Sequence, residues 1–240
     1  MKYLALLLFI ACASHHKDDF SPPKPFVVSK NMTMEQVVKG KKTEPTKCTV
    51  LNGEKYCQWD EKTAVHFVND KAVKEIVLPS SPMILNINMV SLKSKEQEEK
   101  VVKFSPAKGS FLQDSEEWNL YVPMITKTLQ KAGYTVTEDA QAAKQNVVLN
   151  YGLKTISTAQ VNRFLKMFSY SNPLDPKTKA RDLWRVELSS PGSSRDLKRI
   201  MPIFVAAAYK LLTSNERVNE IRKVSENDLE VIAFHDQAKR

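Results

Sequence analysis

The chain has 240 residues, of which 42% are hydrophobic and 26% charged, and its formal net charge is +9. This length allows one large domain or two small ones, and together with a mean hydropathy of −0.37 it excludes a disulfide miniprotein, a wholly disordered chain and a protein with many membrane spans. No motif in the sequence fixes an enzymatic activity.

The N-terminus has the layout of a bacterial export signal. A cationic start at Lys2 precedes the apolar run Tyr3–Ile10, which is far shorter than the roughly 20 residues of a membrane-spanning helix. Small residues then lead into a polar segment that begins at His15. The sequence therefore predicts a signal peptide at this end of the chain.

The apolar run ends in residues 9–12, Phe-Ile-Ala-Cys, which resemble the cleavage site of bacterial lipoproteins. The resemblance implies cleavage after a signal peptide of residues 1–11 and acylation of Cys12, and Ala13 implies sorting to the outer membrane. Residues 12–25 would form a lipid-anchored tether, because a polar segment rich in proline stays extended. The alternative is ordinary export with cleavage after Ala13, which would give a soluble periplasmic protein.

Two further cysteines, Cys48 and Cys57, would enter an oxidising compartment after export. Asn52 and Gly53 between them predict a two-residue type I′ turn of a β-hairpin. Counting outward from this turn places the two cysteines opposite each other at a non-hydrogen-bonded position, where the Cα atoms are about 4.5 Å apart and a disulfide can form. We therefore expect a structural disulfide between Cys48 and Cys57.

The hairpin belongs to a predicted small α+β domain over residues 26–78. Before it, Met32–Lys39 has the pattern of a short helix that Asn31 or Thr33 opens and Gly40 ends. After it come two predicted strands joined by a turn at Asn69 and Asp70, over Thr63–Val68 and Ala72–Val77.

This order of elements resembles the small protein A family, the small accessory lipoprotein of the outer-membrane β-barrel assembly machine. The resemblance covers about fifty residues and rests on Met32, Thr33, Glu35, Gln36, Val37, Glu44, Pro45, Trp59, Val65, Phe67, Asn69 and Val73. It implies a role in envelope assembly. The alternative is a generic small α+β unit with no such role.

Residues 79–82 form a predicted linker, residues 83–235 a larger α+β domain, and residues 236–240 a tail. Two amphipathic helices are expected, one ending at Gly133 and one following Ser193 and Ser194. Predicted strands, the basis of a twisted and mostly antiparallel sheet, lie near Val136 and over Met83–Val90, Asn146–Tyr151, Phe164–Tyr170, Leu183–Leu188, Val218–Val224 and Glu230–Phe234.

The larger part resembles a bacterial envelope lipoprotein family catalogued only as a domain of unknown function. The resemblance implies a compartment and a fold, with no established activity. It rests mainly on the run Leu183, Trp184, Val186, Ser189, Ser190, Gly192, Ser193, Ser194, Asp196, Leu197, Pro202, Ala206, Ala207 and Ala208, with Phe104, Pro106, Ser110, residues 121–134, 150–152 and 162–166, Glu226, Asp228 and Val231 in support.

The best candidate site is Ser193, Ser194 and Arg195 at the start of the second amphipathic helix. Backbone amides and basic side chains there could bind a phosphate group or a peptidoglycan carboxylate. The alternative is helix capping by Ser193 or Ser194, with Asp196 favourable in the first turn. We expect no metal site, no cofactor and no catalytic residues, since no histidine lies beside a nucleophile motif.

These observations predict a non-catalytic outer-membrane lipoprotein that faces the periplasm and takes part in envelope organisation or assembly through protein interaction. Its expected partners are the membrane, through the lipid anchor, and other envelope proteins. Export makes nucleic acid an improbable partner. The alternative function is a periplasmic module that binds peptidoglycan or a phosphate group through Ser193, Ser194 and Arg195.

Overall fold

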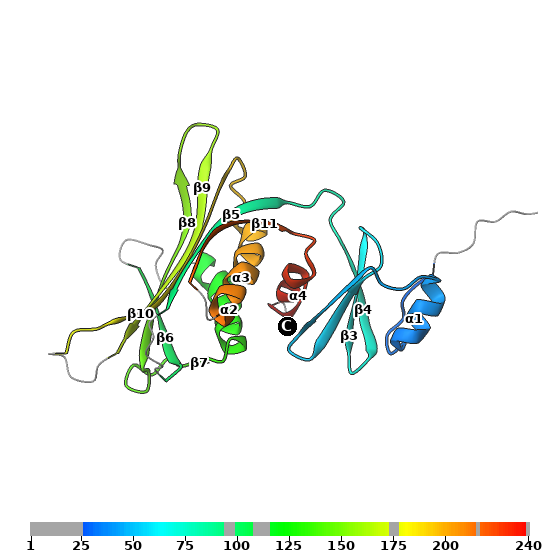
Figure 1. Cartoon of the computed structure of the whole chain (residues 1–240), viewed down its shortest axis with the longest axis horizontal. Helices are drawn as coiled ribbons and strands as arrows, with labels where there is room; N and C mark the ends of the chain where they lie inside the picture. The colour runs from blue at the N-terminus through cyan, green and yellow to red at the C-terminus, as the bar shows by residue number, and fades with distance from the viewer. Residues whose placement is uncertain (1–25, 94–98, 108–115, 173–177, 215–216, 239–240) are drawn as a thin grey trace, which may run out of the picture.

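The computed structural model describes residues 26–93, 99–107, 116–172, 178–214 and 217–238. The expected signal peptide, Cys12 and the tether lie outside these residues. The described chain has an α+β fold with one four-stranded and one seven-stranded sheet, as the sequence predicts (Figure 1). The two sheets lie towards opposite ends of the molecule.

The smaller sheet begins after a short helix, α1 (Met34–Lys41). Thr33 caps this helix through a capping box with Gln36, so α1 starts two residues later than predicted. It also runs through Gly40, which the sequence predicts to end it. A side chain at this position would collide with the ring of Phe26, 2.0 Å from an added Cβ. Gly40 therefore allows close packing and does not end the helix.

Four antiparallel strands follow in chain order, β1 (Lys47–Leu51), β2 (Glu54–Gln58), β3 (Thr63–Val68) and β4 (Lys71–Val77). The φ angles at the β1–β2 turn are 55° at Asn52 and 74° at Gly53, and those at the β3–β4 turn are 51° at Asn69 and 58° at Asp70. Positive φ at both central residues is the signature of the tight hairpin turn that the sequence predicts.

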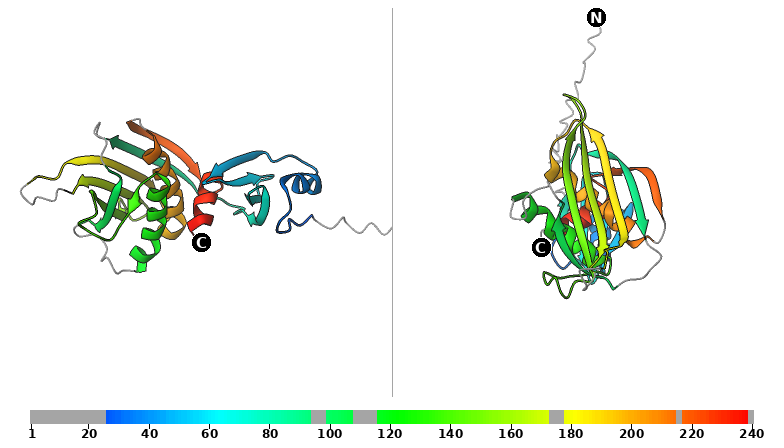
Figure 2. Two further views of the ribbon diagram at one scale, coloured as in Figure 1. Left: turned by 90° about the horizontal axis from the view of Figure 1, so that it is seen from below. Right: turned by 90° about the vertical axis from the view of Figure 1, so that its left-hand side faces the viewer.

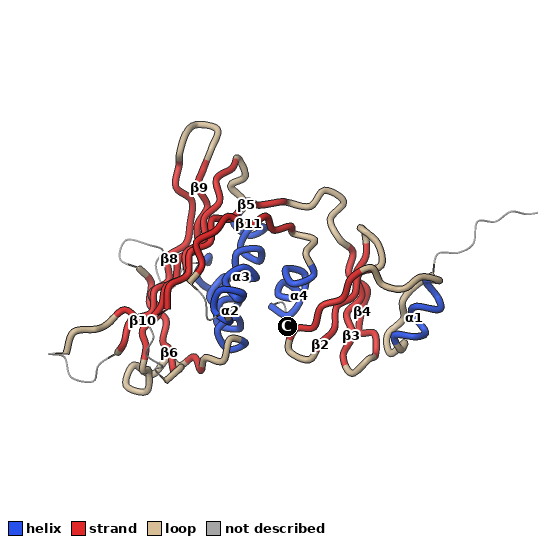
Figure 3. Tube along the Cα trace, in the orientation of Figure 1, coloured by secondary structure: helices blue, strands red, loops and turns tan. Residues whose placement is uncertain are grey.

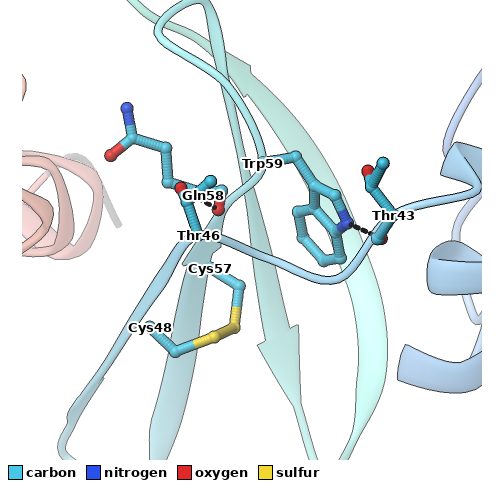
Figure 4. Close-up of a disulfide and its surroundings, with 6 residues drawn as sticks. All are labelled: Thr43, Thr46, Cys48, Cys57, Gln58 and Trp59. Atoms are coloured by element: carbon cyan, nitrogen blue, oxygen red, sulfur yellow. Dashed lines mark hydrogen bonds between the residues drawn. A yellow bond between two sulfur atoms is a disulfide. The ribbon is translucent and has the colours of Figure 1, made fainter.

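The expected hairpin register holds, and Cys48 lies opposite Cys57. The two residues form a disulfide across β1 and β2 (Figure 4). Beside it, the Trp59 indole donates a 2.8 Å hydrogen bond to the carbonyl of Thr43. The disulfide and this bond fasten the start of β1 and the chain before it to the rest of the small sheet.

The larger sheet has the order β11-β5-β10-β9-β8-β6-β7. Its strands are β5 (Ile84–Lys93), β6 (Val101–Pro106), β7 (Thr135–Val136), β8 (Gln145–Thr155), β9 (Val161–Ser171), β10 (Asp182–Gly192) and β11 (Val218–Ser225). All neighbours are antiparallel except β6, which pairs in parallel with β7 and β8. Helices α2 (Glu116–Lys131) and α3 (Leu197–Thr213) cover one face and leave the other face uncovered in the described chain (Figures 2 and 3).

Two local predictions for the larger domain are wrong. Glu230–Phe234 is expected to be a strand but lies in a helix, α4 (Leu229–Ala238), whose apolar residues are buried on nearly every side. Periodicity cannot distinguish such a helix from a buried strand. Strand β6 is absent from the prediction because lysine and proline interrupt its apolar residues.

The predicted tail of residues 236–240 is also wrong for its first three residues, because α4 extends to Ala238. Asp236 and Gln237 are buried, since α4 lies between the helices of the larger domain and the small sheet (Figure 1). Leu51, Tyr56 and Leu78 of the small domain pack in the same apolar cluster as α3 and α4. The two parts of the chain therefore share a core through α4.

Candidate functional site

The densest group of titratable side chains lies where α4 meets the small sheet. His66 on β3 is fully buried, with its Nε2 atom 3.1 Å from Oε2 of Glu54 and its Nδ1 atom 3.5 Å from Oδ2 of Asp236. Its ring stacks on Tyr56, with ring centroids 4.5 Å apart and planes 5° from parallel. Lys74 on β4 forms an ion pair with Asp236.

The next residue of α4, Gln237, extends this cluster. Its amide nitrogen donates to the Leu51 carbonyl at 3.1 Å and to Glu54 at 2.9 Å, and its amide oxygen accepts a 2.9 Å bond from Asn52. From α2, Lys131 donates to the same amide oxygen, and Lys127 donates to the Gln237 backbone carbonyl at 2.9 Å. The tip of the β1–β2 hairpin, α2 and α4 are thus joined by a single side chain.

We name the side chains of Glu54, Tyr56, His66, Lys74, Asp236 and Gln237 the interdomain clasp. Its ionisable groups face each other, and most of its bonds join the small sheet to α4. Buried polar groups arranged in this way fix how two elements pack, because leaving any of them unpaired is costly. Among the described residues, no three His, Cys, Asp or Glu side chains are placed to hold a metal ion.

Beside the clasp lies a pocket of about 270 Å³ between the two domains. We name it the interdomain pocket. One wall is the end of β4 and the linker, residues 76–79, and the other comes from α3, α4 and the end of β11. Its floor is mainly apolar, with Ile76, Leu78, Pro202, Val231 and Ile232 among the lining residues.

Charged residues surround this apolar floor. Arg199 binds Glu226 through several hydrogen bonds of 2.6–3.0 Å. Burial opposes ionisation of Glu226, but hydrogen bonds from Arg199 and from the backbone amide of Met83 outweigh it and lower the pKa of this carboxyl. Arg199 and Glu226 therefore form a hydrogen-bonded ion pair in which each charge neutralises the other.

The structure places the predicted Ser193–Ser194–Arg195 site in the loop between β10 and α3. The N-cap of α3 is Asp196, which accepts a 3.1 Å hydrogen bond from the Arg199 amide, so the expected capping by Ser193 or Ser194 is wrong. A carboxylate at this helix N-terminus takes the place that a bound anion would need. The geometry therefore gives the anion-binding hypothesis no support.

Buried Arg163 holds the chain just before this loop. It donates to the Ser190 carbonyl at 2.9 Å, to the Ser190 hydroxyl at 3.1 Å and to the Pro191 carbonyl at 2.7 Å. An added Cβ at Gly192 would lie only 2.4 Å from the guanidinium. The glycine therefore leaves room for an arginine that fixes the end of β10.

A second hollow, of about 350 Å³, lies over β5, β8, β9 and β10 on the uncovered face of the larger sheet. It is lined by the amides of Asn88, Asn150 and Asn162, by Phe164, and by the ion pair of Lys166 and Glu187 at 2.8 Å. Most of its lining is apolar, and the one close ion pair along it is already formed.

The sequence does not predict the clasp. His66 shows only as a strand residue and Asp236 as part of a tail, so neither attracts a functional assignment. The contacts of Asp236 with His66 and Tyr56 span 170 and 180 positions of the chain. The apolar run Val231–Phe234 just before Asp236 is the one local sign that this end of the chain is buried.

Comparisons with known proteins do not assign a family. No protein-family model matches the sequence, and no curated protein matches it. Two structures of the PelC dodecamer from Paraburkholderia phytofirmans are 11% and 10% identical to the chain, each with a TM-score of 0.38, over 54% of this chain and 99% of PelC. A PDZ domain protein from Parabacteroides distasonis is 10% identical with a TM-score of 0.37, over 83% of this chain and 55% of its own.

Proposed function

We propose that this protein is a non-catalytic lipoprotein of the bacterial outer membrane, anchored through Cys12, that faces the periplasm and acts by binding other envelope proteins. The N-terminal signal supports the anchor and the compartment. Among the described residues, no helix is long and apolar enough to cross a membrane.

The observation that carries the binding role is the interdomain pocket. Its lining is mainly apolar, and its two acidic residues are already paired, Glu226 with Arg199 and Asp236 with Lys74. Lys198, which also lines it, is largely exposed. An apolar hollow whose acids are already paired suits the side chain of a protein partner better than a reaction that moves protons.

The test is photocrosslinking in living cells with the full chain. A photoreactive amino acid replaces one exposed residue at a time on both domains, including Val77 beside the pocket and Asn88 on the uncovered sheet face. We expect adducts with a specific envelope protein, identified by mass spectrometry and shown to bind the purified chain. If no position on either domain gives a protein adduct, the proposed function is wrong.

A further inference from the structure

The outer strand β4 of the small sheet is only partly covered on its free side. Its first half pairs with the segment before α1, where Ala72 donates a 2.7 Å bond to the Met32 carbonyl and accepts a 2.8 Å bond from the Asn31 amide. Its second half, from Glu75 to Val77, has no such neighbour among the described residues. Part of the sheet edge is therefore open.

Strand pairing shows which backbone groups this open edge presents. Leu78 donates a 2.7 Å bond to the Lys62 carbonyl on the β3 side, and Ile76 lies opposite Ala64. Because backbone groups alternate along an antiparallel strand, the N–H and C=O groups of Glu75 and Val77 point away from β3. No backbone or side-chain hydrogen bond to these groups exists in the described chain.

The interdomain pocket opens along this same edge. Ile76 and Val77, the last two residues of β4, both line it, although successive side chains of a strand point to opposite faces. Leu78 and Pro79 continue this wall beyond the strand. The pocket must therefore border the edge of β4 as well as one face. A strand added beside Val77 would direct alternate side chains towards the apolar floor of the pocket.

Charge at the rim adds a further constraint. The rim acids Glu226 and Asp236 are already paired with Arg199 and Lys74. Lys198, in contrast, has a side chain 69% exposed, and its one ion pair in the described chain is a 3.8 Å contact with the exposed Glu116. The excess charge at the rim is positive, which favours a carboxylate on the occupant.

The edge strand of the larger sheet carries more exposed charge than the open end of β4. Strand β11 exposes Glu220, Arg222 and Lys223 around the apolar Ile221, and charged residues on an edge strand discourage pairing with another chain. At the open end of β4 the exposed side chain is Val77, 81% accessible. An apolar residue at an unpaired edge is the pattern of a strand that accepts a partner.

We propose that an extended segment of a partner protein adds to the outer edge of β4 as a fifth strand. It inserts one aliphatic side chain into the interdomain pocket and places an acidic residue near Lys198. Backbone hydrogen bonds then supply affinity and the pocket supplies specificity, as in other complexes formed by strand addition. This inference rests on the proposed function and specifies the chemistry of the partner.

The test uses octapeptides selected from a random display library on the full mature chain. We expect the enriched peptides to share an aliphatic residue and an acidic neighbour. Val77→Pro should weaken their binding about tenfold or more, because it removes an outward N–H that is unpaired in the free protein. Val77→Thr, which keeps the N–H, should bind the selected peptides with an affinity within about twofold of that of the parent chain. Lys198→Glu should selectively weaken the binding of acidic peptides.

Two controls separate binding from folding. Lys223→Glu, an exposed charge reversal on β11, should leave peptide binding unchanged. N-methylation of alternate peptide residues should abolish binding when the methylated residues face β4, and this arm needs no change in the protein. Strand addition is wrong if the enriched peptides bind Val77→Pro as tightly as they bind the parent chain, and if their N-methylated forms bind the parent chain as tightly as the unmodified peptides do. Protein adducts found only at positions away from Val77 would also overturn it and leave the proposed function standing.

Discussion

Replacing Asp236 by alanine tests whether the interdomain clasp holds the two domains together. The carboxylate is 7% exposed and contacts three groups from the small sheet: Tyr56 at 3.2 Å, His66 at 3.5 Å and Lys74. Asp236→Ala therefore removes one of the two acceptors near the buried Tyr56 hydroxyl and the carboxylate beside the buried His66 ring.

The magnitude follows from the exposure of each partner. A hydrogen bond to a charged group contributes about 1.5–3 kcal/mol, which applies to the buried Tyr56, while His66 lies 3.5 Å from the carboxylate in a close polar contact. The Lys74 side chain is 46% exposed, so its pair contributes only about 0.5 kcal/mol after solvent screening. We expect Asp236→Ala to lower the free energy of unfolding by about 3 kcal/mol, within the range for breaking a buried ion pair.

Urea unfolding at pH 7 measures this loss, and a double-mutant cycle with His66→Gln isolates the coupling between the two residues. Glu61→Gln, an exposed change in the same domain, should alter stability by less than about 0.5 kcal/mol. An Asp236→Ala loss no larger than that of Glu61→Gln, or additive effects of Asp236→Ala and His66→Gln, would refute the structural role of the clasp.

Three further predictions concern other parts of the chain. Serine at both Cys48 and Cys57 should lower the free energy of unfolding by about 2.5 kcal/mol, because the disulfide closes a short loop, and unchanged urea unfolding would contradict this. Gly192→Ala should cost about 1–3 kcal/mol, since its Cβ would lie 2.4 Å from the buried guanidinium behind it; a wild-type thermal midpoint would show that the collision is absent. Because Arg199 helps to lower the pKa of Glu226, their pair stabilises the fold above the unfolded pKa of a glutamate, about 4.3, and this contribution is lost as the pH falls through the lower folded value. Glu226→Gln should therefore weaken the acid dependence of unfolding measured between pH 2 and 7, and an unchanged profile would contradict it.

Elements with strong local signals could be predicted from the sequence. Asn52–Gly53 and Asn69–Asp70 take positive φ at consecutive residues, which few sequences allow, so both hairpin turns follow from local chemistry, as does the register of β1 with β2. The register of β3 with β4 shifts between His66 and Phe67, which the turn alone does not predict. The amphipathic pattern of α3 likewise predicts a helix, although its cap, Asp196, is two or three residues beyond the serines expected to serve.

The parts that could not be predicted depend on contacts between distant segments. Helix α4 is buried on nearly every side, so its sequence lacks the alternation that distinguishes helix from strand. The clasp joins His66 to Asp236, and the pocket joins Ile76 to Val231, through packing that no local pattern encodes. The predicted Ser193–Arg195 site relied on backbone amides and basic side chains at a helix N-terminus, and the carboxylate of the neighbouring Asp196 occupies that position.

The most direct test of a disulfide-containing envelope lipoprotein is the intact mass of the mature protein extracted from bacterial membranes, measured with and without thiol alkylation under non-reducing conditions. We expect a chain that begins at an acylated Cys12 and shows no alkylation of Cys48 or Cys57. An unlipidated chain that begins at Ser14 and is found in the soluble periplasmic fraction would contradict the account.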